Sequence, residues 1–312
     1  MAFVGKMAYL VLFPGILFIL LAGLLAEVVS TGMGTALAGG ERRGAAAHVA
    51  WLSAAFDQEA IATGGALGAV IWLAPVVKAV ALAWVSCIIF GFFSGDLVLL
   101  FALLLVAGGA DLFAALLSAN PLAVQEAWAE AASLLAWAVP FALVLAAVAL
   151  RSGEVSVSGL IKWQAANGVL LASSSGGATA QAGGALALVA AISAAVALAR
   201  LRPLGRSYTS GSPGGMLDDV SGPPLAMFAG SEAAALFVVP LVIVTLFFAG
   251  PSASWYQVLF WALKVLGVII LLLLIDLLSA RCDSRTVIRW GVGAAGLIAL
   301  LGLVLTWIGV SG

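Results

Sequence analysis

Residues 257–279, QVLFWALKVLGVIILLLLIDLLS, are almost entirely apolar and hold only two charged side chains, Lys264 and Asp276. At 1.5 Å per residue, a helix of this length crosses a hydrocarbon core of about 30 Å. The whole chain fits this interpretation, because 64% of its 312 residues are hydrophobic, 9% are charged and the mean hydropathy is +1.22. Soluble domains carry roughly 25% charged residues. The sequence therefore predicts an all-α, polytopic integral membrane protein.

Seven further apolar runs of similar length bring the number of predicted transmembrane helices to eight. The predicted spans are residues 8–29, 65–92, 96–117, 131–150, 181–199, 224–249, 257–279 and 287–309. Most of the stretches between them are rich in glycine and polar residues. We therefore expect one transmembrane domain over residues 1–312, whose abundant alanine and glycine favour close contact between helices.

The basic residues predict which loops share a side of the membrane. With eight spans, the loops after the first, third, fifth and seventh spans lie together and hold eight arginines. These are Arg42, Arg43, Arg200, Arg202, Arg206, Arg281, Arg285 and Arg289. The opposite side holds Lys6, Arg151 and Lys162. Because cytoplasmic loops carry the excess of positive charge, we expect the arginine-rich loops in the cytoplasm and both termini on the outer side.

Composition also excludes several classes of function. The formal net charge of −1 gives no indication of nucleic-acid binding. The chain has two cysteines, no CxxC pair and one histidine, His48, so it cannot ligate an iron–sulfur cluster or a zinc ion by itself. Residues 48–61 alternate apolar and polar positions at helical spacing, which predicts an amphipathic helix on the cytoplasmic surface.

Several ionisable side chains lie within or at the edges of the predicted spans, where a central charge costs at least about 2.5–3.5 kcal/mol on insertion scales. They are Glu27, Lys78, Asp96, Asp111, Glu232, Lys264 and Asp276. Glu27 and Asp96 lie near span ends and are expected to reach the interface. The deeper acids and Lys264 leave two interpretations open, namely buried pairs that neutralise each other or an ion pathway.

Five segments resemble, in the same order, the sequence pattern of one family. They are GDLVLLFALLLVAGGADLFAALL (95–117), SANPLAVQEAWAEAASLLAWAVPFAL (118–143), GEVSVSGLIKWQ (153–164), LDDVSGPPLAMFAGSE (217–232) and WALKVLGVIILLLLIDLLSARCDSRTVIRW (261–290). The pattern is similar to that of complex I membrane subunit 1. The resemblance includes the equivalent membrane subunits of group 4 NiFe hydrogenases and formate hydrogenlyase. Members of this family have eight spans and both termini on the outer side.

The resemblance implies a membrane subunit of an ion-translocating oxidoreductase, of the NADH:quinone or the membrane-bound hydrogenase type, in a prokaryotic cytoplasmic membrane. Such a subunit anchors a soluble electron-transfer module beside antiporter-like membrane subunits and lipid, and couples redox chemistry to H⁺ or Na⁺ translocation. It implies no cofactor in this chain. Iron–sulfur clusters, and a NiFe centre or quinone, are expected in partner subunits or at the interface. The alternative is a stand-alone transporter or scaffold without a redox partner, which would favour internal repeats.

The resemblance also implies roles for particular residues. The expected ion pathway consists of Asp219, Glu232, Lys264, Asp276, Asp111 and Glu130. Docking of the soluble module is expected at Arg42, Arg43, Arg202, Arg206, Arg281 and Arg285. No catalytic or metal-binding residue is expected in the chain.

The chain departs from the family pattern at several charged positions. Ala138 stands where the family has a glutamate in the fourth span, and Ala129 where it has an arginine. No acidic residue occurs between Glu154 and Asp218, where relatives have several. These changes predict a subunit that connects its partners, with ion movement in other chains.

Overall fold

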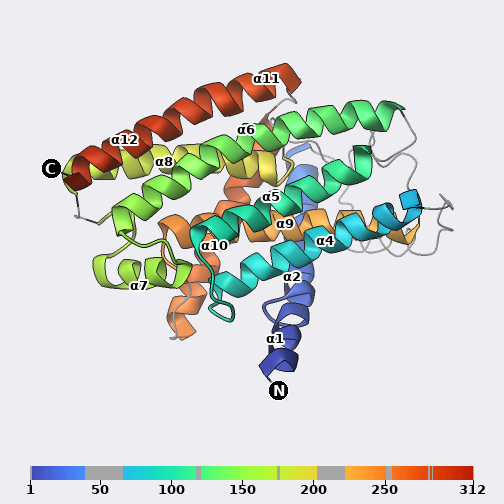
Figure 1. The fold of residues 1–312 in the computed structure, drawn as a ribbon, viewed down its shortest axis with the longest axis horizontal. Helices are drawn as coiled ribbons and strands as arrows, with labels where there is room; N and C mark the ends of the chain where they lie inside the picture. Colours follow the sequence, from blue (N-terminus) through green and yellow to red (C-terminus); the bar gives the residue numbers. More distant parts are fainter. Residues whose placement is uncertain are drawn as a thin grey trace.

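A computed structural model of the protein describes residues 2–38, 66–116, 121–173, 176–201, 222–250, 255–279, 282 and 284–311. Over these ranges the chain is helical and forms no strand (Figure 1). Within the residues that the structure describes, eight segments are long and apolar enough to cross a membrane: Gly5–Ser30, Ile71–Ile89, Leu97–Ala114, Glu130–Ser152, Gly177–Leu198, Pro223–Phe247, Gln257–Leu278 and Arg285–Ser311. This confirms the all-α, polytopic fold with eight spans. The placement of both termini on the outer side stays a prediction.

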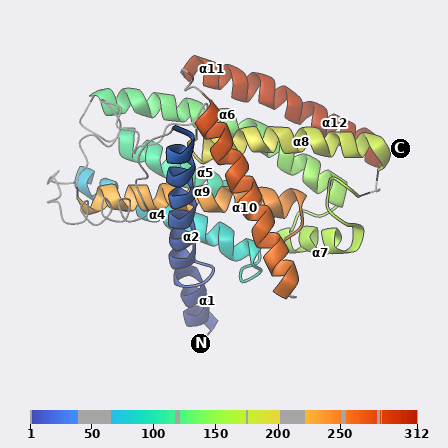
Figure 2. The ribbon, with the colours of Figure 1, turned by 180° about the vertical axis from the view of Figure 1, so that it is seen from behind.

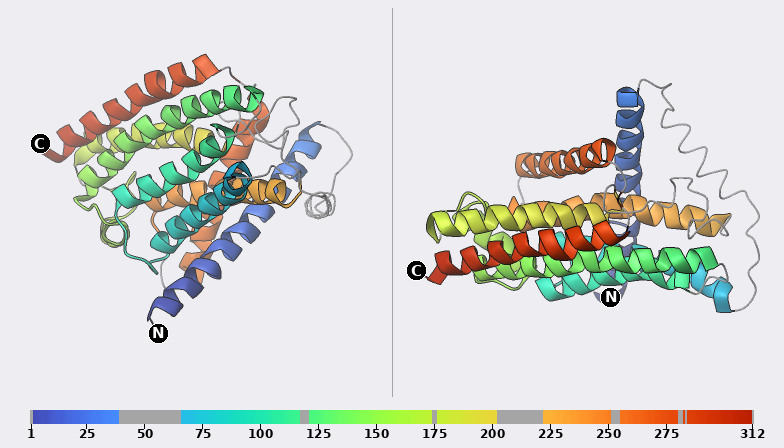
Figure 3. Two further views of the ribbon diagram at one scale, coloured as in Figure 1. Left: turned by 45° about the vertical axis from the view of Figure 1, so that its right-hand side comes forward. Right: turned by 90° about the horizontal axis from the view of Figure 1, so that it is seen from above.

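The helices form one bundle with two steeply inclined members. In chain order the elements are α1 (Ala2–Val11), α2 (Ile16–Ala38), α4 (Ala66–Ile89), α5 (Leu97–Leu116), α6 (Pro121–Ser152), α7 (Val157–Asn167), α8 (Gly177–Leu198), α9 (Pro223–Phe247), α10 (Trp255–Leu278), α11 (Ser284–Ile288), the π-helix η2 (Arg289–Ala295) and α12 (Gly296–Ser311). Helices α4, α5, α6, α8, α9 and α12 run roughly along one direction, whereas α2 crosses them steeply (Figure 3). From behind, α2 and α10 both cross one face of the bundle (Figure 2).

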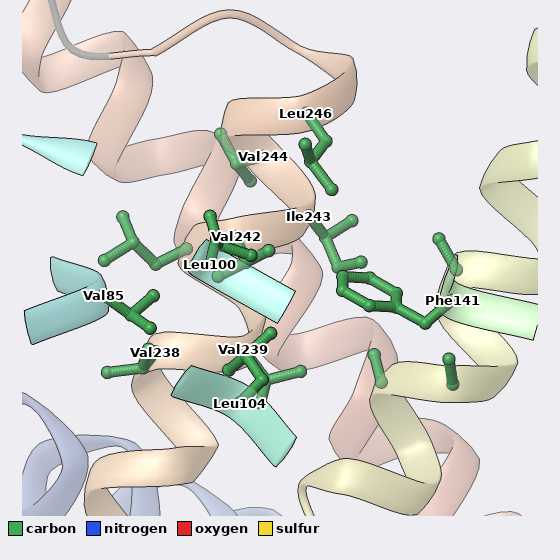
Figure 4. Close-up of a cluster of buried hydrophobic side chains, with 14 of the residues drawn as sticks. Val85, Leu100, Leu104, Phe141, Val238, Val239, Val242, Ile243, Val244 and Leu246 are labelled. Carbon is green, nitrogen blue, oxygen red and sulfur yellow. The ribbon is translucent and has the colours of Figure 1, made fainter. Parts of the chain in front are cut away.

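Helix α9 is the centre of this arrangement. It packs against α2, α4, α8 and α10, and most of its side chains are buried. Figure 4 shows successive α9 side chains facing different neighbours: Val238 lies beside Val85 of α4, and Val239 lies beside Leu104 of α5. Because α9 is apolar on every side, it is buried all round, as the hydropathy of its sequence requires. Its one charged residue, Glu232, is thereby placed inside the protein.

Helices α8 and α12 approach each other closely through glycines. A Cβ atom added at Gly302 would lie 3.0 Å from the Ala187 nitrogen and 3.0 Å from the Gly183 oxygen. One added at Gly309 would lie 2.6 Å from the Ala180 nitrogen. The two backbones are therefore in direct contact, which is the arrangement that small residues permit in membrane helices.

The beginnings of α5 and α7 are joined by a single antiparallel bridge between Asp96 and Ser156. Each of these residues also caps its own helix, since Asp96 Oδ1 accepts a hydrogen bond from the Leu99 amide at 2.6 Å and Ser156 Oγ accepts one from the Gly159 amide at 3.0 Å. Asp96 is exposed. Side-chain caps of this kind satisfy the free amides of a first helical turn. We call this end of the bundle the α7 end.

Long polar side chains reinforce the α7 end by binding backbone carbonyls. Gln164 Nε2 of α7 donates to the carbonyl oxygens of Thr245 and Leu246 at 3.1 and 2.9 Å, near the end of α9. Lys264 Nζ of α10 donates to the Phe248 carbonyl oxygen at 2.8 Å. These bonds satisfy acceptors that the end of helix α9 leaves without intrahelical donors.

Arg151, the penultimate residue of α6, binds backbone carbonyls at and just before the beginning of α8. It is buried, and its guanidinium donates to the Ala180 carbonyl oxygen and, at 2.9 Å, to the Ser173 carbonyl oxygen. Gly184 permits this approach, because a Cβ atom there would lie 2.8 Å from Arg151 Nη1. The ends of α6 and α9 and the beginnings of α5, α7 and α8 are thus connected at one end of the bundle.

Candidate functional site

A cluster of buried charges lies toward the opposite end of the bundle. Each of four spans contributes one side chain, and a fifth side chain directly follows another span. These are Lys78 of α4, Asp111 of α5, Glu130 of α6, Arg200 directly after α8, and Glu232 of α9. We call these five residues the charge cluster. Their helices alternate in direction, so the cluster falls late in α5 and α8 and early in α6 and α9.

Short ion pairs connect the members of the charge cluster. Asp111 Oδ2 lies 2.6 Å from Lys78 Nζ and 2.9 Å from Arg200 Nη2. The same Arg200 nitrogen lies 2.8 Å from Glu130 Oε1, and Arg200 Nη1 lies 3.8 Å from Glu232 Oε1. Arg200 therefore contacts all three acids. Asp111 accepts both of its ion pairs with one oxygen.

Burial divides the charge cluster into a deep part and a shallow part. Lys78, Asp111 and Arg200 are 4%, 0% and 6% exposed. The side chains of Glu130 and Glu232 are 12% and 14% exposed. Removing charges from water is costly unless they are paired, and each deep charge here has at least one opposite charge within hydrogen-bond distance. The glutamates are the members that retain most access to the surroundings of the chain.

The position of the Arg200 guanidinium depends on an unusual backbone conformation. Helix α8 ends with a Schellman turn, in which the Arg200 amide bonds to the Ala197 carbonyl at 3.1 Å and the Leu201 amide bonds to the Val196 carbonyl at 2.9 Å. Arg200 is the left-handed residue of this turn, with φ = 55°. Glycine usually occupies that position, since a side chain there costs about 1–2 kcal/mol. The turn leaves the Arg200 side chain among the three acids.

The structure brings together three of the six residues expected in an ion pathway: Asp111, Glu130 and Glu232. The other two described residues of that set lie in α10, which contributes no side chain to the charge cluster. Lys264 is exposed and bonds to the end of α9, and Asp276 is half-buried two residues before the end of α10. Their roles in ion movement stay predictions.

The remaining predicted site residues fall mainly in parts of the chain that the structure does not describe. Those outside the described residues are Asp219, Arg42, Arg43, Arg202, Arg206 and Arg281, and the predicted amphipathic helix over residues 48–61 lies there as well. Arg285 is described, and its side chain is exposed in α11. Docking by this residue stays a prediction.

Sequence reasoning did not assign Lys78 and Arg200 to the site. Lys78 gave a usable signal, because it is a lone lysine in the middle of an apolar run. Arg200 gave a weaker signal, because it is the first of several arginines after a span and resembles a loop residue in sequence. Among the residues that the structure describes, no group of three histidine, cysteine or acidic side chains is arranged to hold a metal ion.

Comparison with known proteins assigns the chain to a family. The family model described as NADH dehydrogenase matches residues 8–307. The chain belongs to this family, that of complex I subunit 1. This confirms the resemblance found in the sequence. The chain is an integral membrane subunit of a complex I-like oxidoreductase.

A solved structure has the same fold. It is a chain of the membrane-bound sulfane sulfur reductase, an archaeal respiratory membrane complex, with a TM-score of 0.82 and 19% sequence identity. The similarity covers 98% of this chain and 99% of that chain. At this identity the match supports the fold. A search of curated proteins found no match.

Proposed function

We propose that this subunit couples redox chemistry in a soluble electron-transfer module to H⁺ or Na⁺ translocation, and that the charge cluster is the element through which it does so. The observation that carries the proposal is the meeting of charged residues from four spans with Arg200, which follows a fifth. Ionisable residues inside membrane helices are rare and mark ion paths and proton relays. A change in the charge of any one member alters the field at all the others.

The composition of the charge cluster favours this role over simple neutralisation. A single Lys78–Asp111 pair would already compensate each of its charges. The chain instead adds Arg200, in a backbone conformation that disfavours a side chain, together with two partly accessible glutamates. Buried ion pairs stabilise proteins weakly, and apolar substitutes are often neutral or better. An energetically unfavourable arrangement of this size is therefore better explained by function than by stability.

The proposed assembly follows from the same reasoning. The arginine-rich loops, including Arg285, dock the soluble module in the cytoplasm, and both termini lie on the outer side of a prokaryotic cytoplasmic membrane. Antiporter-like subunits and lipid surround the bundle. The chain holds no cofactor; iron–sulfur clusters, and a NiFe centre or quinone, belong to partner subunits or to their interface with this chain. The family membership supports this arrangement.

A substitution at Glu232 tests the proposal. In the assembled complex, reconstituted into liposomes, Glu232→Gln removes one charge and retains the shape of the side chain. We expect the number of ions moved per electron transferred to fall, while assembly and electron transfer by the soluble module persist. Ion uptake and donor oxidation are measured on the same preparation.

Glu154→Gln is the matched control, because Glu154 is exposed at the α7 end. Glu154→Gln should leave ion uptake and donor oxidation at the wild-type level. If Glu232→Gln moves as many ions per electron as the wild type does, the cluster is structural and the proposal fails.

A further inference from the structure

An apolar cavity lies next to the charge cluster, between the same four helices that carry its acids and Arg200. Its lining comes from α5, α6, α8 and α9 and consists of alanine, aliphatic and aromatic side chains. They include Leu104, Trp137, Phe141, Leu198, Val239 and Ile243. We call these six residues the apolar seal. No polar atom of the described residues faces this cavity, whereas a buried water needs two to four hydrogen-bond partners.

The spacing along the chain fixes where the apolar seal lies. Leu104 precedes Asp111 by seven residues, Trp137 follows Glu130 by seven, and Val239 follows Glu232 by seven. Seven residues are about two helical turns, so each pair shares a helix face and is separated by roughly 10 Å along the axis.

The directions of the helices place the apolar seal on one side of the charge cluster. Helices α5 and α8 run toward the cluster from the α7 end, whereas α6 and α9 run from the cluster toward it (Figure 1). In each of these three pairs, the seal residue therefore lies nearer the α7 end than the charged residue does. The apolar seal lies between the charge cluster and the α7 end of the bundle.

The apolar seal lies within longer apolar stretches of the same helices. In α9, the twelve residues 233–244 between Glu232 and Thr245 are all apolar, which corresponds to about 18 Å of helix. In α5, residues 97–110 are apolar as well. Figure 4 shows the packing in this region, where Ile243 faces Phe141 and Val239 faces Leu104. An ion that reached the charge cluster would meet a long apolar barrier on these faces.

We propose that the apolar seal makes the charge cluster one-sided: ions or protons exchange with it from the side of Glu130 and Glu232, and the seal closes the route toward the α7 end. Apolar constrictions close pores by excluding water. The subunit then contains a half-path and no transmembrane route of its own, so translocation across the membrane is completed in partner chains. This inference rests on the proposed role of the cluster in ion movement.

The test measures passive ion permeability of the assembled complex in liposomes without an electron donor. An imposed pH difference drives H⁺ entry, which an entrapped pH-sensitive dye reports, and a parallel assay with a Na⁺ indicator covers the other ion. Two seal variants are compared with the wild type: the double variant Val239→Thr with Ile243→Thr, and the single variant Val239→Asp. Val238→Thr is the matched control, because Val238 is equally buried in α9 but faces Val85.

We expect the wild type and Val238→Thr to admit H⁺ and Na⁺ equally slowly, and both seal variants to admit these ions several-fold faster. Adding Glu232→Gln to the double variant should bring the leak back toward the wild-type rate, because the leak passes through the cluster. The inference is overturned if assembled Val239→Asp is as tight as the wild type, or if Val238→Thr leaks as fast as the seal variants. Passive permeability is independent of turnover, so failure here is distinct from failure of coupled transport in Glu232→Gln.

Discussion

Lys78 and Asp111 form an ion pair of 2.6 Å between α4 and α5, and both side chains are almost completely buried. The two residues are 33 positions apart, and the hairpin of α4 and α5 brings them to the same depth in the bundle. Arg200 joins the pair at 2.9 Å from the same carboxylate oxygen. This carboxylate therefore connects three spans.

Removing one partner of this pair should destabilise the protein more than removing both. Lys78→Met alone leaves Asp111 with fewer cations, and breaking a buried pair from one side costs about 3–5 kcal/mol. The double variant Lys78→Met with Asp111→Leu should recover much of that loss. Thermal unfolding of the detergent-extracted complex measures both effects.

The same double variant separates structure from function. If it is stable and still moves the wild-type number of ions per electron, the pair serves only to hold α4 and α5 together. We expect it to be stable and uncoupled.

Arg200 should reveal opposing backbone and side-chain contributions. Arg200→Gly removes the cost of about 1–2 kcal/mol that a side chain adds in the left-handed conformation. It also removes the cation that three acids share. We expect a net loss of stability and of coupled transport. Arg200→Lys keeps the charge but not the forked geometry, and should retain part of both.

Ala249→Gly is the control for the stability gained by placing glycine in a left-handed conformation, since Ala249 also has a positive φ, 76°. It should stabilise the protein slightly and leave transport unchanged. A gain in stability from Arg200→Gly comparable to that of Ala249→Gly would show that the ion pairs of Arg200 contribute nothing.

The glycine contact between α8 and α12 should tolerate no side chain. Gly302→Val inserts atoms where the Gly183 and Ala187 backbones lie, and overpacking of this kind costs about 1–3 kcal/mol or more. We expect a lower unfolding temperature and less assembled complex. Gly267→Val in α10 is the control, because nothing lies within 4 Å of a Cβ atom at that position. Equal effects of the two substitutions would contradict a specific contact.

Arg285 should contribute to docking of the soluble module through charge. Arg285→Ala is expected to lower the salt concentration at which the module dissociates from membranes, because exposed charges attract each other less as salt increases. Lys162→Ala, an exposed basic residue of α7, serves as the comparison. Retention of the module is measured by washing membranes at increasing ionic strength. Identical dissociation of both variants and the wild type would exclude a docking role for Arg285.

The spans could be predicted from sequence because the length of an apolar run alone identifies them. The predicted span 257–279 and the observed one, Gln257–Leu278, differ by a single residue. Glu130 directly precedes the predicted fourth span, 131–150, and it is the first residue of the observed one, although α6 itself begins at Pro121.

The pairing within the site could not be predicted in the same way. Hydropathy gives the depth of a residue but not the rotation of its helix about its own axis, so it could not show that Asp111 faces Lys78 or that Lys264 faces the end of α9. Arg200 was assigned to a loop because its sequence neighbours, Arg202 and Arg206, look alike. The left-handed backbone of Arg200 in the Schellman turn, which no sequence pattern indicates, brings its side chain among the acids.

The two ends of the bundle are held by chemically different contacts. At the α7 end, Gln164, Arg151 and Lys264 bind backbone carbonyls, whose partial charges are constant. At the other end, Asp111, Glu130 and Arg200 connect α5, α6 and the end of α8 through full charges, which an ion or a proton can cancel. An arriving ion or proton therefore changes the strength of the contacts between helices at the charge cluster, whereas the carbonyl contacts at the α7 end keep theirs.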